Sequence, residues 1–199
     1  VPAFLVKDIY PGIDDSEPEE LVALNGLLYF GATDGVHGNE IWTSDGTAEG
    51  TNMFKDIHDG AGDSNSYDST SWDRDITLMG TSLYFAATDG DHRVGLWKSD
   101  GTPEGTSELH SVSPGNFIVY KNALYFTGYN ESDSELWTSD GTAGTKGTSG
   151  GTEMVKNISA DSYSYAGSDS GFTLYKNEIY FSARNTNSNT PSELCGLWR

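Results

Sequence analysis

The sequence has few basic residues, a single cysteine and no long apolar run. Among its 199 residues, 11 Lys and Arg stand against 30 Asp and Glu, so the formal net charge is −19. This charge argues against nucleic acid or an anionic membrane surface as a partner, since both would repel the protein. The lone Cys195 excludes an intrachain disulfide and a multi-cysteine metal site, and we expect a buried, inert thiol there. No segment approaches the roughly 20 apolar residues of a membrane-spanning helix, so we expect no membrane insertion.

Aromatic residues and glycine are plentiful, with 5 Trp, 8 Phe, 11 Tyr and 24 Gly, which a disordered acidic chain would lack. The first residues, Val1-Pro2-Ala3-Phe4, carry no signal peptide, so an exported protein would be the processed chain. Low Lys and high Asp, Gly, Ser and Thr favour an extracytoplasmic location: secreted, on the cell surface or in an organelle lumen. Two glycosylation sequons, at Asn130 and Asn157, are weak support.

Two short patterns recur four times along the chain, each time in the same order. The first is an aliphatic residue followed by Tyr-Phe, at residues 28–30, 83–85, 124–126 and 179–181. The second is an aliphatic residue followed by Trp, at residues 41–42, 96–97, 136–137 and 197–198. A Ser-Asp-Gly-Thr turn and a short apolar run follow the first three Trp residues. The fourth copy stops at Arg199, and the run that it lacks matches Phe4–Ile9 at the other end of the chain.

Each copy predicts four strands, which in the first copy are Leu21–Leu24, Leu27–Thr33, Glu40–Ser44 and Asn52–Ile57. The three apolar residues of the Tyr-Phe strand indicate burial on both faces. A four-stranded unit of about 40 to 55 residues is typical of a propeller blade. We therefore predict a single all-β domain over 1–199, a four-bladed β-propeller with repeats at about 10–57, 58–112, 113–158 and 159–199 plus 1–9. Residues 4–9 form the strand that closes its last blade.

The run Glu135-Leu136-Trp137-Thr138-Ser139-Asp140-Gly141-Thr142 resembles the ELWxxDGT repeat family, and Val155–Ile158 continues the likeness. The other copies depart from the motif at Ile41, at Gly95-Leu96 and at Cys195-Gly196-Leu197. The resemblance implies tandem repeats in a secreted or surface protein and implies no particular activity.

Several features suggest sites, and most have a simpler structural explanation. Asp45, Asp100 and Asp140 offer oxygens to calcium, but Asp-Gly-Thr is also ordinary turn chemistry, which we favour. The acidic residues Asp14, Asp15, Glu17, Glu19, Glu20, Asp59, Asp63 and Asp68 fit solvated loops, with a loose calcium site as the alternative. His37 and His92 take equivalent places in two copies, too few ligands for a metal.

No pattern selects a catalytic residue. The run Gly147-Thr148-Ser149-Gly150-Gly151 matches the serine-hydrolase elbow but lies in a Gly/Thr/Ser insertion without the required strand and helix. We therefore expect no enzyme, no catalytic residues and no cofactor. A carboxylate-dependent glycosidase or lyase is the weakest alternative.

Aromatic residues outside the recurring patterns are the best candidates for partner binding. They are Trp72, Tyr67, Tyr163 and Tyr165. Exposed aromatic rings in loops suit sugar stacking or protein docking. The sequence thus favours a non-enzymatic interaction module that binds a protein or glycan. A peripheral accessory subunit of a larger membrane complex, docked on its extracellular or luminal face, is the alternative.

Overall fold

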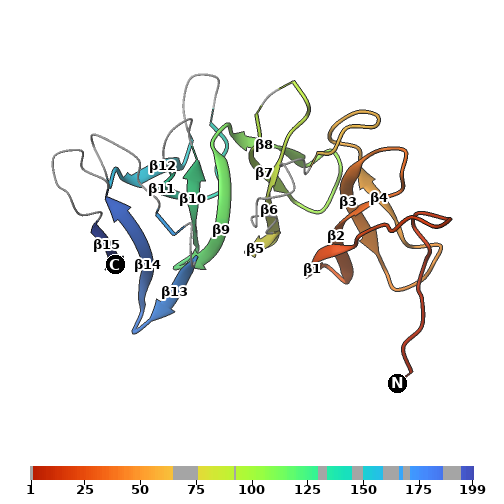
Figure 1. Ribbon diagram of the computed structural model, residues 1–199, viewed down its shortest axis with the longest axis horizontal. Coiled ribbons are helices and arrows are strands. Elements are labelled where there is room, and N and C mark those ends of the chain that lie inside the picture. The colour runs from red at the N-terminus through yellow and green to blue at the C-terminus, as the bar shows by residue number, and fades with distance from the viewer. Residues whose placement is uncertain are drawn as a thin grey trace.

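The computed structural model (Figure 1) describes residues 2–64, 76–91, 93–129, 134–144, 150–158, 166–167, 171–185 and 194–199. Within these ranges the regular structure is entirely β-strand, so no helix there has the length and apolar character needed to cross a membrane. Four antiparallel sheets follow one another along the chain. Sheet 1 holds β1 (Glu19–Leu24), β2 (Leu27–Thr33), β3 (Asn39–Ser44) and β4 (Asn52–Lys55); sheet 2 holds β5 (Thr77–Met79), β6 (Ser82–Ala87), β7 (Gly95–Ser99) and β8 (Thr106–His110). Sheet 3 holds β9 (Ser113–Tyr120), β10 (Ala123–Tyr129), β11 (Ser134–Ser139) and β12 (Thr152–Lys156); sheet 4 holds β13 (Phe172–Tyr175), β14 (Glu178–Asn185) and β15 (Leu194–Trp198).

Each sheet is a meander in which strands adjacent in sequence pair side by side. Tight turns make this possible: in the β1–β2 turn, Asn25 and Gly26 have φ of 51° and 84°, the conformation that a two-residue hairpin needs. The same register recurs in all four sheets, because a Phe always stands opposite a Trp. These pairs are Phe30 with Trp42, Phe85 with Trp97, Phe126 with Trp137, and Phe181 with Trp198.

The apolar core lies mainly between successive sheets. Three clusters share one composition: a side chain that follows the last strand of one sheet packs on a Phe and a Trp of the next. Their members include Ile57, Phe85 and Trp97 between sheets 1 and 2, Val112, Phe126 and Trp137 between sheets 2 and 3, and Ile158, Phe181 and Trp198 between sheets 3 and 4. Burying a side chain of this size stabilises the fold by about 1.5–3 kcal/mol, so these contacts hold neighbouring sheets together.

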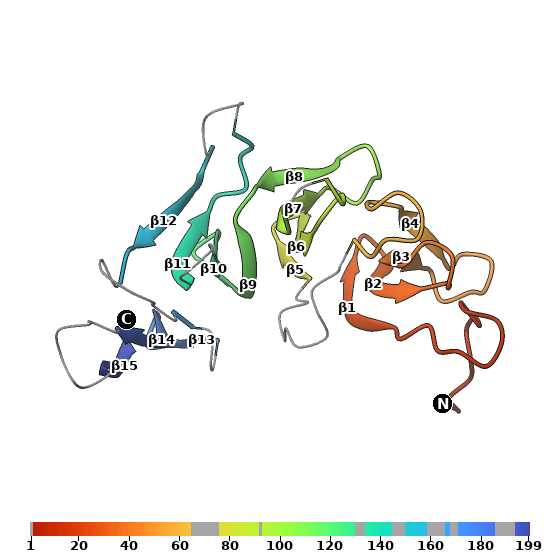
Figure 2. The same ribbon diagram turned by 45° about the horizontal axis from the view of Figure 1, so that its top comes forward.

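The four sheets are arranged side by side in an arc, with the N-terminus beyond sheet 1 and the C-terminus in sheet 4 (Figures 1 and 2). The described clusters join sheet 1 to 2, 2 to 3 and 3 to 4. The all-β class is therefore confirmed. In the described residues the array is open.

Residues 4–9 correct one prediction, because they form no strand in the structure. Sheet 4 has three strands in the described residues, and none pairs with the outer side of β15. The physical reason is position: Ile9 is buried on sheet 1 against Phe30 and Trp42, at the end of the arc opposite β15. Phe4 and Leu5 are 74% and 79% exposed, without a strand to pair with.

Candidate functional site

The aromatic residues singled out by the sequence lie outside the described residues. They fall in two segments between sheets: Tyr67 and Trp72 in 65–75, and Tyr163 and Tyr165 in 159–165. The structure does place the residues from which these segments leave and to which they return. Ser64, Ile158 and Ala166 are all buried. Both segments are therefore tied to the core at described positions.

Ser64 anchors the first segment to two sheets at once. Its amide lies 3.1 Å from both the Asn39 carbonyl and Glu40 Oε1 of sheet 1, and it donates to these oxygens. Its carbonyl accepts a 2.8 Å hydrogen bond from the Thr88 amide of sheet 2. Because Ser64 is 1% exposed, these bonds are shielded from water and fix the point where residue 65 begins.

Ala166 anchors the second segment in a similar way. Its amide donates to the Ser134 carbonyl at 2.9 Å, and its carbonyl accepts from Thr127 Oγ1 at 2.8 Å, both in sheet 3. The next amide, of Gly167, donates to the Ser182 carbonyl of sheet 4 at 2.8 Å. This segment, too, returns to a joint between two sheets.

A buried carboxylate organises the first joint. Glu40, in β3, is 1% exposed, and its oxygens accept backbone hydrogen bonds from Ile57 (2.9 Å), His58 (3.2 Å) and Ser64 (3.1 Å). Burial raises the pKa of the Glu40 carboxyl above its ordinary value, although the three N–H donors act in the opposite direction. One carboxylate thus ends strand β4 and bends the chain toward sheet 2.

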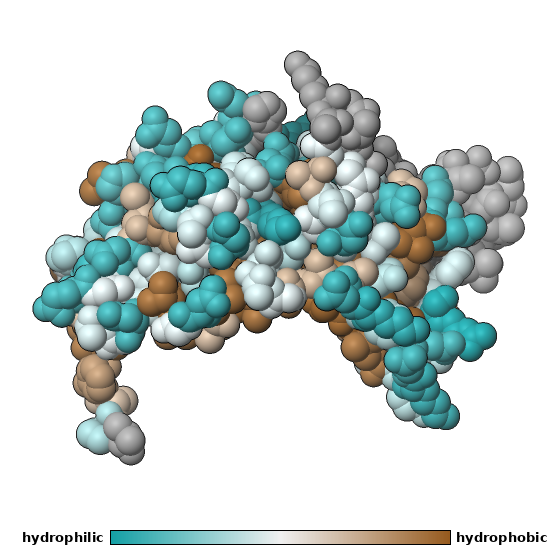
Figure 3. All heavy atoms as spheres, turned by 180° about the vertical axis from the view of Figure 1, so that it is seen from behind, coloured by the Kyte–Doolittle hydropathy of each residue, from teal (hydrophilic) through white to brown (hydrophobic). Residues whose placement is uncertain are grey.

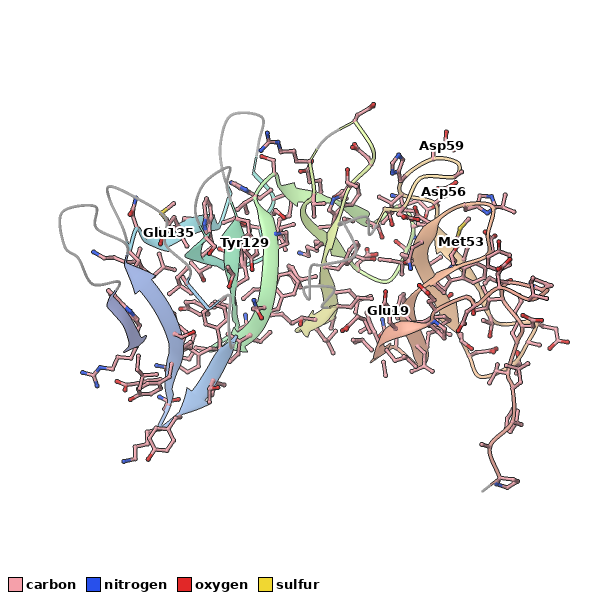
Figure 4. All side chains as sticks on the ribbon, viewed as in Figure 1. Glu19, Met53, Asp56, Asp59, Tyr129 and Glu135 are labelled. Carbon is pink, nitrogen blue, oxygen red and sulfur yellow. The ribbon has the colours of Figure 1, made fainter. Side chains whose placement is uncertain are left out.

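Glu135 plays the same part in sheet 3, where it is 1% exposed and accepts from the Ile158 amide at 2.9 Å. Figure 4 labels Glu135 on β11. The equivalent residue of sheet 2 is Gly95. A Cβ on Gly95 would lie 2.4 Å from Glu108 Oε1, so the carboxylate of Glu108, from β8, fills the space beside this glycine. Sequence reasoning missed these buried glutamates. The signal was present, since Glu40 and Glu135 each stand two residues before a recurring Trp.

A small pocket lies between sheets 1 and 2, at the base of the segment that contains Trp72. The carboxylates of Glu20 and Glu40 and several apolar side chains, among them Phe85 and Ala87, line this pocket. Ser64 and Ile76, which flank the segment, also line it.

The Asp-Gly-Thr turns have the hydrogen bonds of turn chemistry, as predicted. In the β3–β4 turn, Asp45 Oδ1 accepts from the Thr47 amide at 2.9 Å and from its hydroxyl at 2.7 Å. These bonds lower the pKa of Asp45, and the same arrangement lowers the pKa of Asp100 and Asp140. Oδ1 of each aspartate is thus already used within its own turn.

The same turns contact the neighbouring sheet. Tyr29 of sheet 1 donates its hydroxyl to the Gly101 carbonyl in the turn of sheet 2, at 3.2 Å. Between sheets 2 and 3 the approach is closer, because a Cβ on Gly141 would lie 2.0 Å from the Tyr84 hydroxyl. In sheets 2 and 3 the end that carries this turn therefore contacts the preceding sheet.

The opposite end carries acidic loops. Asp56 and Asp59 lie just beyond the end of β4 (Figure 4), and Asp63 Oδ1 accepts from the Asn39 amide at 2.7 Å. Asp14, Asp15 and Glu17 are exposed, as expected for solvated loops, and Asp68 lies outside the described residues. Glu19 and Glu20 correct that prediction, because they lie half-buried in strand β1, where Glu19 pairs with Gly31 of β2. Where the structure describes the chain, it brings no three His, Cys, Asp or Glu side chains together as a metal site.

His37 belongs to a local turn. Its Nδ1 lies 2.8 Å from Asp34 Oδ2, and this hydrogen bond raises the pKa of His37. Burial tends to raise the pKa of Asp34, but hydrogen bonds from Val36 and His37 outweigh it, so that pKa is lowered. The pair stabilises the β2–β3 hairpin, and His92 lies outside the described residues.

The structure describes only some of the remaining positions that the sequence singles out. Asn157 is exposed, whereas Asn130, Ser149 and the Cys195 side chain lie outside what the structure describes. Comparison of the chain with protein-family models gives no match, and comparison with curated proteins gives none either.

Proposed function

We propose that the protein is a non-enzymatic interaction module in which the four sheets are blades of a β-propeller. It binds a protein or glycan partner through the loops at one end of the blades. The two ends of the sheets differ in a way that supports this division. The Asp-Gly-Thr turns of sheets 2 and 3 contact the preceding sheet at one end. The acidic loops and Ser64, from which residues 65–75 continue, lie at the other end, and such loops commonly bind partners.

The fixed ends of residues 65–75 are the observation that carries the proposal. Ser64 is fixed to both neighbouring sheets and borders the pocket between sheets 1 and 2 together with Ile76. A loop that leaves from such rigid anchors loses less entropy on binding than a free loop. Trp72 and Tyr67 lie between these anchors in the sequence, and aromatic rings supply much of the binding energy at protein and sugar interfaces.

An extracytoplasmic location belongs to the same proposal. It rests on the resemblance to ELWxxDGT repeats, on the composition and on the exposed sequon at Asn157. Occupancy of that sequon by a glycan is open to direct mass measurement.

A charge-docked accessory subunit is the second candidate, favoured by the acidic loops. Asp34, Asp56, Asp59, Asp63, Asp89 and Asp91 all lie at the loop end of sheets 1 and 2. Together with a net charge of −19, they suit a basic surface on a partner. Such docking weakens at high ionic strength, because salt screens the attraction.

A glycan array probed with the labelled protein, followed by calorimetric titration of any hit, tests the first candidate. We expect Trp72→Ala to weaken binding about tenfold or more, the loss typical of an aromatic anchor. Tyr175→Ala is the matched control, because Tyr175 is an exposed aromatic residue in β13 of sheet 4. Equal binding by both variants and the unchanged protein would refute the assignment to this loop.

Native mass spectrometry of gently purified material tests the second candidate. A larger complex that releases the 21.5 kDa chain when NaCl rises from about 0.05 to 0.5 M supports docking through charge. A free chain at both salt concentrations contradicts it.

A further inference from the structure

The N-terminal segment contacts sheet 1 in the way that the segment after β4 contacts sheet 2. Residues 7–16, which we call the N-terminal linker, align with residues 55–64 at a constant offset of 48 (55 − 7 and 64 − 16). Four contacts made by the two segments correspond.

Two of these contacts involve the start of each segment. Lys7 Nζ donates to the carbonyl of Thr51 in the Asp-Gly-Thr turn of sheet 1, and Lys55 Nζ donates to the equivalent carbonyl of Thr106 in sheet 2. Ile9 is 8% exposed and packs on a Phe, an Ala and a Trp of sheet 1. Ile57 is 7% exposed and packs on the equivalent three residues of sheet 2.

The other two contacts involve the end of each segment. The Thr33 amide donates to the Ser16 carbonyl at 3.0 Å, as the Thr88 amide donates to the Ser64 carbonyl at 2.8 Å. The Tyr10 ring packs on Gly35, where an added Cβ would lie 2.2 Å from the ring. The His58 ring packs on Gly90 in the same way, also 2.2 Å from an added Cβ. The N-terminal linker therefore takes the place of the last strand and linker of a sheet that would precede sheet 1.

No described strand pairs with residues 4–7 at this end of the arc, and the outer edge of β15, at the other end, pairs with no described strand either. β4 pairs with β3, but Phe4 and Leu5 are exposed and project with the N-terminus as a stalk beyond the body of the protein (Figure 3). β15 in turn lacks a fourth strand among the described residues. Leu197 is 79% exposed, whereas the equivalent Ile41 and Leu96 are 7% and 0% exposed.

We propose that β15 of one copy pairs with residues 4–7 of a second copy, so that the chain associates head to tail. The register of β3 with β4 places Trp198 opposite Leu5 and Leu197 opposite Lys7. A second copy fits better than the same chain, because the N-terminal linker already docks on sheet 1 at the far end of the arc from β15 (Figures 1 and 2). Pairing between copies leaves every docked contact in place. Such heterologous contacts build closed rings or open filaments.

The proposed contact between copies lacks the glutamate that sheets 1 and 3 have, and this permits a gain-of-function test. Glu40 and Glu135 accept the amides that follow the last strand of their sheets, but the equivalent residue of sheet 4 is Gly196. Among the described residues, a Cβ on Gly196 meets only Trp198 Nε1, at 3.8 Å, so a glutamate fits there. Gly196→Glu should offer its carboxylate to the Ile9 and Tyr10 amides of the second copy and tighten association.

Sedimentation velocity from about 1 to 100 µM tests the proposal. We expect concentration-dependent association that Leu5→Pro weakens about tenfold or more, because proline removes an N–H and disrupts strand pairing. Leu5 is 79% exposed, so this variant keeps its fold. Ile13→Ser, at a fully exposed apolar residue, is the control that leaves association unchanged. Gly196→Glu should strengthen association several-fold.

The effect of salt distinguishes this self-association from docking through charge on a basic partner. Two copies that each carry −19 repel one another, so added NaCl should strengthen self-association. The proposal is overturned if the wild-type protein and the Gly196→Glu variant both stay monomeric over the whole concentration range. Slow exchange of the Leu5 amide in such a monomer would assign the pairing to the same chain, which also overturns association between copies.

Discussion

Three equivalent glycines allow the contact between sheets to be measured separately from the turn. Gly46, Gly101 and Gly141 occupy the Asp-Gly-Thr turns of sheets 1, 2 and 3 with φ of 89°, 93° and 80°. Gly→Ala therefore costs a similar amount of backbone strain at each. The surroundings differ: a Cβ on Gly46 meets nothing within 4 Å, whereas on Gly141 it lies 2.0 Å from the Tyr84 hydroxyl.

The expected free energies of unfolding follow from this difference. Gly46→Ala should destabilise the protein by about 1–2 kcal/mol, the cost of a left-handed conformation for an L-residue. Gly141→Ala adds a clash with Tyr84, whose side chain is 2% exposed and has little room to move. Overpacking costs about 1–3 kcal/mol, so the total should be about 2–5 kcal/mol. Gly101→Ala should fall between, since its Cβ would lie 3.1 Å from the Tyr29 hydroxyl.

Urea unfolding followed by tryptophan fluorescence measures these values at low protein concentration. The excess cost of Gly141→Ala over Gly46→Ala should shrink in a Tyr84→Phe background, because the clashing oxygen is gone. Equal costs at Gly46 and Gly141, or an excess that Tyr84→Phe leaves unchanged, would refute the close approach of sheets 2 and 3.

The remaining predictions concern titratable side chains. Glu40→Ala should cost about 2–4 kcal/mol, because the Ile57 and His58 amides lose their acceptor and the Ser64 amide keeps only the Asn39 carbonyl, while Glu153→Gln, at an exposed glutamate of β12, should change stability by less than about 0.5 kcal/mol. Because the folded-state pKa of Glu40 is raised, its titration favours folding below the ordinary value of 4.5, and this contribution is lost as pH rises through the folded-state pKa. The stability of the wild type relative to Glu40→Gln should therefore be greater at pH 4.5 than at pH 7, and a relative stability independent of pH would contradict the raised pKa. For Asp45, Asp100 and Asp140 the sign is opposite: their pKa values are lowered, so their contribution is present above the ordinary 3.8 and lost as pH falls. Thr47→Val removes the hydroxyl donor to Asp45 and should reduce the acid dependence of Tm between about pH 5 and 2, whereas an unchanged dependence would exclude this donor as its cause.

Strand order and core positions could be predicted because they depend on local pattern. The strand Leu27–Thr33 was predicted with the observed bounds, and the turn at Asn25-Gly26 follows from residues that adopt positive φ readily. The prediction that the Tyr-Phe strand is buried on both faces is confirmed by Tyr29 and Phe30, at 1% and 6% exposure. The continuous apolar run and the turn residues carry this information directly.

Features that depend on distant partners could not be predicted. The last strand of sheet 1 was expected to reach Ile57 but ends at Lys55, because Glu40 takes the Ile57 amide out of the ladder. A glutamate in a strand suggests exposure, and only the bonds that it accepts explain its burial. Residues 4–9 have the pattern of a strand, but a pattern does not say whether a pairing strand lies within reach.

Hydrogen exchange of the N-terminal linker tests most directly the claim that each sheet holds the segment that precedes it. Measured at low protein concentration, where copies do not associate, residues 7–16 should exchange more slowly than an unstructured peptide, because Ile9 is buried on sheet 1 and the Ser16 carbonyl accepts from the Thr33 amide. Exchange at 55–64 should be slower still, because Glu40 also accepts hydrogen bonds from the amides of that segment. Exchange of residues 7–16 at the rate of an unstructured peptide, with slow exchange retained at 55–64, would contradict the account.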